Sequence, residues 1–189
     1  MRLVLILILI ISSCSFSVVK QEKKDIIVWQ ENKPLTWDDF RGKPERRFAA
    51  ASTHYDIIKS LNKVNDVSAE INIEAIFLCK KSWKKTIWVN PSVLAHEQKH
   101  FDIVELYARK LRKQLTQIKV HSEEDAEQKL DSLYKIIDAE MDAYQDKYDD
   151  ETNSSMSHDA QISWIKKIDA AIDSLSAYQN TEVKLKTAF

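Results

Sequence analysis

The sequence has almost no glycine. Gly42 is the single glycine in 189 residues, where average usage of about 7% would give about thirteen. Phosphate-binding loops, dinucleotide-binding fingerprints and serine nucleophile elbows each need at least two glycines close together, so these enzyme classes are excluded. The chain also has three prolines, and this shortage of turn-forming residues favours long helices over a many-turned β sandwich. We expect Gly42 to adopt a positive φ in a tight turn between Phe40 and Pro44.

The charged residues are nearly balanced, with 28 basic and 29 acidic side chains and a formal net charge of −1. Nucleic-acid-binding proteins normally carry a basic excess, so the composition indicates no nucleic-acid partner. Cysteine is also scarce. Of the two cysteines, Cys14 lies in the leader described next, which leaves no disulfide framework. Cys79 ends an apolar strand pattern, and we expect it to be a buried, unreactive thiol.

The first residues have the pattern of an export signal. After a basic start, residues 3–11 form an apolar run of nine, which is too short to span a bilayer but suits a signal peptide. The run ends in Ser12-Ser13-Cys14, which resembles a bacterial lipoprotein box. We therefore expect residues 1–13 to be a signal peptide and residues 14–25 to be a lipidated cysteine and tether. A lipid on Cys14 would hold the protein at a membrane face of the bacterial cell envelope, on the periplasmic or outer-membrane side. The alternative is a plain secretory signal with a chance cysteine.

An alternation of apolar and polar residues over positions 67–77 predicts a half-buried β-strand. Its apolar members are Val67, Ala69, Ile71, Ile73, Ala75 and Phe77. Residues 48–60 are expected to form its antiparallel neighbour, with residues 62–66 as the turn, and residues 26–29 are a further short strand candidate. The N-terminal half is therefore predicted to be a small, mostly antiparallel sheet.

The C-terminal half has the apolar periodicity of helices. A first helix is predicted over residues 91 to about 116, with the apolar stripe of a helix packed on one side. Ser122 and Asp125 resemble a capping box, which starts a second helix that runs to about residue 150. Residues 157–177 fit a third helix.

These elements define an α+β fold in which a small antiparallel sheet precedes three helices. The short link between the first two helices makes them antiparallel neighbours. We expect one domain over residues 26–178, followed by a frayed tail over residues 179–189.

Early in the first predicted helix, residues 96–100 read His-Glu-Gln-Lys-His, which is the H-E-x-x-H motif. Four residues are just over one helical turn, so His96 and His100 project from one face, close enough to share a tetrahedral Zn²⁺. Glu97 then lies beside the water-holding position of the metal, where it is a candidate catalytic base. The competing interpretation is a solvated helix face, because His, Glu, Gln and Lys are all common on surfaces.

The sequence around the motif, from Leu94 to Leu111, resembles the bacterial family of predicted secreted zinc-dependent proteases (domain of unknown function 922). Further blocks match in the same order, namely residues 35–44, residues 50–53, Phe77, Ser82-Trp83, Tyr148-Asp149 with Thr152, Gln161 and Trp164. The resemblance implies a zincin-like domain whose first two helices form the zincin-like pair, with Zn²⁺ as the cofactor and a peptide or protein as the substrate.

The third metal ligand is not supplied by the motif. A catalytic zinc site usually has three protein ligands and a water molecule, and H-E-x-x-H provides two. Members of the family tend to carry a histidine two residues after the threonine that corresponds to Thr152. In this chain that position is Ser154, so another residue must serve as the ligand.

Two acidic residues are the leading candidates for this ligand. If the helix hairpin turns at residues 119–120, the motif histidines lie opposite residues 139–143, which brings Glu140 within reach. Asp149 is the rival, because it belongs to a block that matches the family. Glu151 and His158 are weaker candidates.

Three further residues are possible transition-state donors. Tyr144 and Tyr148 lie on the stripe that is predicted to face the first helix, and His54 lies in the predicted strand region. For each of them a packing or structural role is the alternative.

The sequence leads to the hypothesis of a lipid-anchored zinc metallopeptidase. In this hypothesis His96 and His100 hold Zn²⁺ and Glu97 takes a proton from the attacking water. One alternative is a non-catalytic zinc-binding envelope lipoprotein that binds a partner. Another is a metal-free scaffold in which the motif is accidental.

Overall fold

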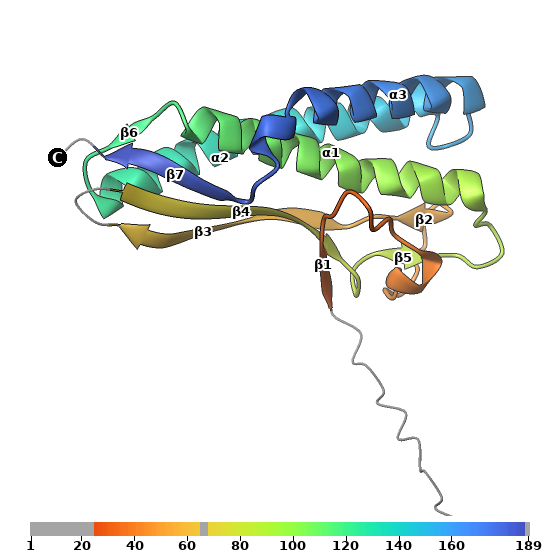
Figure 1. The fold of residues 1–189 in the computed structure, drawn as a ribbon. Helices are drawn as coiled ribbons and strands as arrows, with labels where there is room; N and C mark the ends of the chain where they lie inside the picture. Colours follow the sequence, from red (N-terminus) through yellow and green to blue (C-terminus); the bar gives the residue numbers. More distant parts are fainter. Residues whose placement is uncertain (1–24, 65–67, 188–189) are drawn as a thin grey trace, which may run out of the picture.

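The computed structural model describes residues 25–64 and 68–187. Helix α1 (Pro91–Leu115) lies along a five-stranded sheet, and α2 (Glu123–Thr152) and α3 (His158–Ser174) pack on it from the other side (Figure 1). This arrangement confirms the predicted α+β class with three C-terminal helices. The predicted signal peptide and Cys14 lie outside the described residues, as does the tether up to residue 24.

The sheet is centred on strand β4. This strand pairs with β3 along one edge and with β1 and β7 at the two ends of its other edge, all antiparallel, while β6 runs parallel to β7. The strands are β1 (Ile26–Val28), β3 (Tyr55–Val64), β4 (Ser68–Leu78), β6 (Lys119–Val120) and β7 (Glu182–Thr187). A separate two-stranded sheet joins β2 (Ala51–Ser52) to β5 (Trp83–Lys84).

The alternation predicted for β4 is confirmed. Its apolar residues between Ala69 and Phe77 are fully buried, and Phe77 packs against Phe101 of α1. The neighbouring strand begins at Tyr55 rather than at residue 48, and Asn62 lies within it rather than in the turn. The pairing shifts register between Leu61 and Lys63, and such an irregularity lets a strand continue past the point where its alternation breaks.

The helix starts follow the sequence signals. Asn90 caps α1, where its side chain accepts a hydrogen bond from the backbone N–H of Val93 (3.0 Å), and Pro91 occupies the first turn. Ser122 caps α2 by accepting from the N–H of Asp125 (3.1 Å), and the Asp125 carboxylate accepts from the N–H of His121 (2.9 Å). Two short 3₁₀ helices, η1 (Trp37–Asp39) and η2 (Ser176–Tyr178), complete the list of elements. Within the described ranges no helix has both the length and the apolar character that crossing a membrane would require.

Helix α1 departs from the expected one-sided packing. Every residue from Phe101 to Arg109 is buried, because the sheet covers one side of the helix while α2 and α3 cover the other. The apolar periodicity of the sequence does not predict this burial, because the buried part of the helix also carries charged residues. These charged side chains pair with one another inside the protein. Glu105 accepts hydrogen bonds from Arg109 (2.8 Å) and Arg112 (2.9 Å).

The prediction of a frayed tail over residues 179–189 was wrong. Residues Glu182–Thr187 form β7, which pairs with β4 through residues such as Ile71 and Ala69. Val183 and Leu185 of this strand are buried in the core. Val183 and Leu185 alternate with polar residues, but so short a segment becomes a stable strand because it pairs with β4 and β6 and packs on α1. These partners are distant in the sequence, so the tail alone does not predict them.

The reason for Gly42 also differs from the expectation. Its φ does not lie in the left-handed region. Its N–H donates to the carbonyl of Ser82 (2.7 Å), and a Cβ atom at this position would lie 2.7–2.9 Å from three backbone carbonyl oxygens, those of Lys80, Lys81 and Ser82. The requirement is therefore close approach of two backbone segments, not a special turn.

We expect Gly42→Ala to lower the free energy of unfolding by about 1–3 kcal/mol, because the added methyl group overlaps backbone atoms that cannot move independently. Urea denaturation followed by circular dichroism measures this change. The neighbouring exposed substitution Lys43→Ala is the control and should leave the midpoint nearly unchanged. Equal stability of the two variants would contradict the close-approach explanation.

Candidate metal centre

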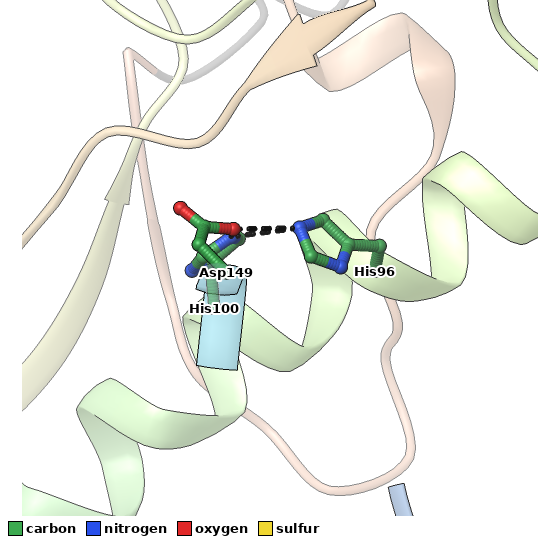
Figure 2. Close-up of side chains that lie close together, drawn as sticks. All are labelled: His96, His100 and Asp149. Carbon is green, nitrogen blue, oxygen red and sulfur yellow. Dashed lines mark hydrogen bonds and ion pairs between the residues drawn. The ribbon is translucent and has the colours of Figure 1, made fainter. Parts of the chain in front are cut away.

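Three potential metal ligands converge where the first turns of α1 meet the last turns of α2. The Nε2 atoms of His96 and His100 lie 3.0 and 3.1 Å from the same oxygen of Asp149, Oδ1, and 3.1 Å from each other. Figure 2 shows the Asp149 carboxylate directed at both imidazoles. The i, i+4 spacing puts the two histidines on one face of α1, and the antiparallel α2 brings the carboxylate to that face.

The donor set fits a small divalent cation. Tetrahedral Zn²⁺ with bonds of about 2.0–2.1 Å separates its ligand atoms by about 3.3–3.4 Å, so the three atoms need to spread by only about 0.3 Å. Two imidazole nitrogens and a carboxylate oxygen all carry lone pairs, and they repel one another unless a proton or a cation lies between them. Imidazole and carboxylate are ligands that zinc commonly takes.

Gln145 fixes the orientation of His100. The side-chain Nε2 of Gln145 donates to the backbone carbonyl of His100 (3.0 Å), so its Oε1 faces His100 Nδ1 at 2.7 Å. An amide oxygen only accepts, so Nδ1 of His100 carries the hydrogen. In the neutral ring Nε2 then keeps its lone pair for a metal, which is the usual arrangement of a metal-ligating histidine.

The ring of Tyr148 packs against the imidazole of His96. The two rings stack with centroids 4.6 Å apart and an interplanar angle of 20°, and the Tyr148 hydroxyl points at the backbone carbonyl of His96 (3.5 Å). Both side chains are buried. Nδ1 of His96 is buried too and has no hydrogen-bond partner among residues 25–64 and 68–187, so stacking on Tyr148 and the contact of Nε2 with Asp149 orient this ring.

The electrostatics of the cluster favour a bound cation. Burial lowers the pKa of His100, but its hydrogen bond to Asp149 and the charges of Glu97 and Asp149 outweigh burial and raise that pKa above its usual 6.5. Burial raises the pKa of Asp149, whereas its hydrogen bonds to His100 and His96 lower it well below the usual 3.8. Asp149 is therefore ionised, and a positive charge at His100 is stabilised.

Glu97 is held beside this cluster. Its carboxylate is buried, and the hydroxyl of Thr53 donates to its Oε2 (2.7 Å). Thr53 lies in the segment between β2 and β3. A buried carboxylate fixed by a single hydroxyl and facing a cavity is suited to exchanging protons with a bound molecule.

The two middle residues of the motif point away from the cluster. Gln98 accepts from the N–H of Leu35 (2.7 Å) and donates to Asp102 (2.8 Å). Lys99 donates to Asp102 (2.7 Å) and forms an ion pair with Asp169 of α3. These bonds fasten the start of α1 to the N-terminal segment and to α3, which limits how the histidines can rotate.

The cluster opens into a cavity of about 810 Å³, a size typical of sites for small molecules or peptide segments. His96, Glu97, His100 and Asp149 form part of its wall. Most of the rest comes from residues 47–53 around β2, from the loop before α1 that contains Trp88, and from the loop after α2. Tyr55 of β3, Gln145 and Asp146 of α2 and the first turns of α1 and α3 complete the wall.

The structure chooses between the predicted third ligands. Glu140 is exposed and its charge acts instead on Tyr107 and Lys110, about two turns away from the cluster. The link between α1 and α2 contains strand β6 and is longer than expected. The residues of α2 that lie opposite the motif are therefore shifted towards its C-terminal end, and His96 faces Asp149. The expectation for Glu140 was therefore wrong, and Asp149 completes the cluster.

The weaker ligand candidates lie around the cluster without joining it. Glu151 accepts from the indole N–H of Trp164 (2.9 Å). His158 and Ser154 both line the cavity. Ser154 lies in a loop in which Asn153, Ser154 and Ser155 all have positive φ, at 50°, 47° and 74°, an arrangement that is costly without glycine and is found at functional sites.

The three candidate donors do not face the reacting space. Tyr144 packs against Tyr107 and Trp164, and Tyr148 directs its hydroxyl at a backbone carbonyl. His54 does not line the cavity, although Thr53 and Tyr55 on either side of it do. Burial lowers the pKa of His54.

Sequence reasoning missed Thr53, Tyr55 and Gln145 as site residues. Burial and the charges of Asp142, Asp146 and Asp149 raise the pKa of Tyr55 above its usual 10.0, so its phenol stays protonated in the cavity wall. Two signals were available. Thr53 ends a block that resembles the family, and Gln145 lies one turn before Asp149 on the face that carries Tyr148.

Comparison with known proteins gives a family but no activity. A search of curated proteins and a search of solved structures found no match. The family model described as a bacterial protein of unknown function (DUF922) matches residues 34–159, which include the motif, Asp149 and every residue that lines the cavity. This match spans about two thirds of the sequence, and the protein belongs to this bacterial family.

Proposed function

We propose that the protein is a zinc-dependent hydrolase that cleaves peptide bonds. The observation that carries the proposal is the convergence of His96 Nε2, His100 Nε2 and Asp149 Oδ1 within 3.0–3.1 Å at the wall of the cavity, next to the buried carboxylate of Glu97. Two histidines and one carboxylate with an adjacent glutamate form the set of groups that a hydrolytic zinc enzyme requires.

Each residue of the site has a separate role in the proposed reaction. His96, His100 and Asp149 would hold the metal, and bound zinc would supply a Lewis acid that polarises a carbonyl and makes water more acidic. Glu97 accepts a proton from the attacking water and delivers it to the leaving amine, so it ends the reaction unchanged. The Thr53 hydroxyl holds one oxygen of Glu97 in place. By holding His100 Nδ1, Gln145 would leave the Nε2 lone pair of His100 available to a metal.

The assignment of Asp149 as the third ligand favours a catalytic metal site over a purely structural one. A serine stands at position 154, where members of the family tend to carry a histidine, and this raised the alternative of a non-catalytic zinc protein that binds a partner. With Asp149 as the third ligand, the protein supplies three ligands without position 154. Three protein ligands are typical of catalytic zinc, whereas structural zinc usually has four.

The proposed place of action is the bacterial cell envelope. The apolar run over residues 3–11 followed by Cys14 supports export and lipidation, and the family supports a bacterial protein. A peptide or protein in the same compartment is the proposed substrate.

We expect Glu97→Gln to reduce peptide hydrolysis by about 10²–10⁴-fold while one zinc ion still binds, because the amide cannot accept the proton from water. The probe is a mixture of peptides from a digested bacterial proteome, and mass spectrometry counts the new termini. Zinc content is measured in the same samples by atomic emission.

Glu140→Gln provides the matched control, since the same change on the exposed face of α2 should leave both readings unchanged. Cleavage that persists in Glu97→Gln would contradict the proposed base. Zinc binding by the unaltered protein, with no cleavage of any peptide, would favour the non-catalytic alternative.

Gln145→Leu should weaken zinc binding about 10–100-fold, because His100 loses the acceptor that fixes its ring. Competition against a coloured zinc chelator measures the dissociation constant. Gln145→Glu retains an acceptor for Nδ1 and should lose less affinity, while the exposed change Gln128→Leu on the same helix should lose none. Unchanged affinity in Gln145→Leu would contradict the positioning role.

Zinc affinity should rise with pH, since the metal competes with a proton on the cluster. The pKa of His100 is raised, so below that pKa the affinity should fall about tenfold per pH unit, and above it the affinity should level off. Titration calorimetry from pH 5.5 to 8.5, in two buffers that differ in ionisation enthalpy, measures both the affinity and the proton released. Affinity that is independent of pH, with no proton release, would contradict the ligand assignment.

A further inference from the structure

Basic side chains gather on one surface of a nearly neutral protein. Residues 41–48 and 80–88 together carry eight basic side chains and one acidic side chain, out of 28 basic and 29 acidic in the whole sequence. The basic residues are Arg41, Lys43, Arg46, Arg47, Lys80, Lys81, Lys84 and Lys85. We call the surface formed by these two segments the basic surface.

The two segments are joined to each other, so the basic surface is a single feature of the fold. The backbone N–H of Gly42 donates to the carbonyl of Ser82 (2.7 Å), and that of Lys85 donates to the carbonyl of Ala50 (2.7 Å), two residues after the first segment. The Lys85 ammonium bonds the carbonyl of Arg47. In Figure 1, η1, β5 and the start of β1 lie together below the helices.

The opposite charge is concentrated elsewhere. Helix α2 carries twelve acidic and three basic residues. The small net charge therefore conceals a strong separation between the basic surface and α2. Such a separation orients a molecule towards an anionic partner.

Large apolar side chains stand exposed within the basic surface. Phe48 is 92% exposed, Ile87 is 87% exposed and Trp88 is 44% exposed. The rings of Phe48 and Trp88 lie 5.7 Å apart, and the Lys85 ammonium lies 4.6 Å from the centre of the Trp88 ring. Aromatic and aliphatic side chains among lysines and arginines are typical of surfaces that lie in the headgroup region of a membrane.

The N-terminal segment leaves the domain at the same place. Asp25, the first described residue, forms ion pairs with Lys80 (2.6 Å) and Arg41 (3.7 Å). Twenty-four residues precede it, and they include the apolar run and Cys14. These residues therefore join the domain at the basic surface rather than at α2.

We infer that the basic surface docks on an anionic lipid bilayer, with Phe48, Ile87 and Trp88 inserted among the headgroups. Lysines and arginines are attracted by the negative surface potential of such a membrane, and the apolar side chains can enter its headgroup region. A nucleic acid would bind the cations but would leave the aliphatic Ile87 exposed.

The cavity adjoins the basic surface. Arg47, Phe48 and Trp88 also line the cavity, so docking would place the cavity mouth at the membrane. The relevance of this last point to substrates rests on the proposed function, whereas the docking itself does not.

The test is hydrogen–deuterium exchange of the full-length protein with lipid vesicles. The vesicles contain phosphatidylcholine alone or with 30 mol% phosphatidylglycerol. We expect amides of residues 45–48 and 86–88 to exchange at least tenfold more slowly with the anionic vesicles than with the neutral ones, and 0.5 M NaCl to reduce this protection. Amides in the loop at residues 153–157, on the other rim of the cavity, should not change.

The paired substitution Phe48→Ser with Ile87→Ser should abolish the protection, since both side chains are exposed and the fold does not depend on them. Ile136→Ser, an exposed apolar residue of α2 (54%), is the matched control and should keep it. The inference is overturned if exchange is the same with both kinds of vesicle, or if the protection survives the paired substitution. It is also overturned if soluble heparin produces the same slowing, because the partner would then be an anionic polymer. None of these results depends on zinc or on hydrolysis.

Discussion

Helix α1 is covered on all sides along its middle, so each of its charged side chains needs a partner inside the protein. Glu105 and Arg112 meet this need, and Arg112 also donates to the carbonyls of Ile73 in β4 (2.8 Å) and Tyr178 in η2 (3.1 Å). The same bonds that satisfy the charges therefore fasten the helix to the sheet and to the segment that leads into β7. A helix held in this way cannot roll, and its N-terminal turns present His96 and His100 in one fixed direction.

The candidate site depends on that fixed direction. Each position of the motif has a different neighbour, because successive helical residues point about 100° apart. The histidines face α2, Glu97 faces Thr53, and Gln98 and Lys99 are tied to the N-terminal segment and to α3. Five consecutive residues thus contact four separate parts of the fold, namely α2, α3, the N-terminal segment and the segment before β3. Residues 34–159, which match the family, include the motif and most of these contacts.

Local patterns predicted the elements well, whereas contacts between distant segments were predicted poorly. The bounds of α1 and α2, the alternation of β4 and the pairing of the two histidines all follow from spacing and capping residues. The position of Asp149 does not, because β6 lengthens the link between the helices and its partner β7 comes from the far end of the chain. Gly42 shows the same limit. Its importance was foreseen, but the carbonyl oxygens that crowd it belong to residues 80–82, which no local pattern connects to it.

His96, His100 and Asp149 are expected to bind one zinc ion together. X-ray absorption at the zinc edge, on full-length protein loaded with one equivalent of Zn²⁺, identifies the ligands. We predict two imidazole nitrogens and carboxylate oxygen at about 2.0–2.1 Å, with the carboxylate contribution lost and the affinity lowered in Asp149→Asn. Failure to bind one equivalent of zinc would contradict the account. So would a zinc spectrum without imidazole, or one that is the same in Asp149→Asn as in the unaltered protein.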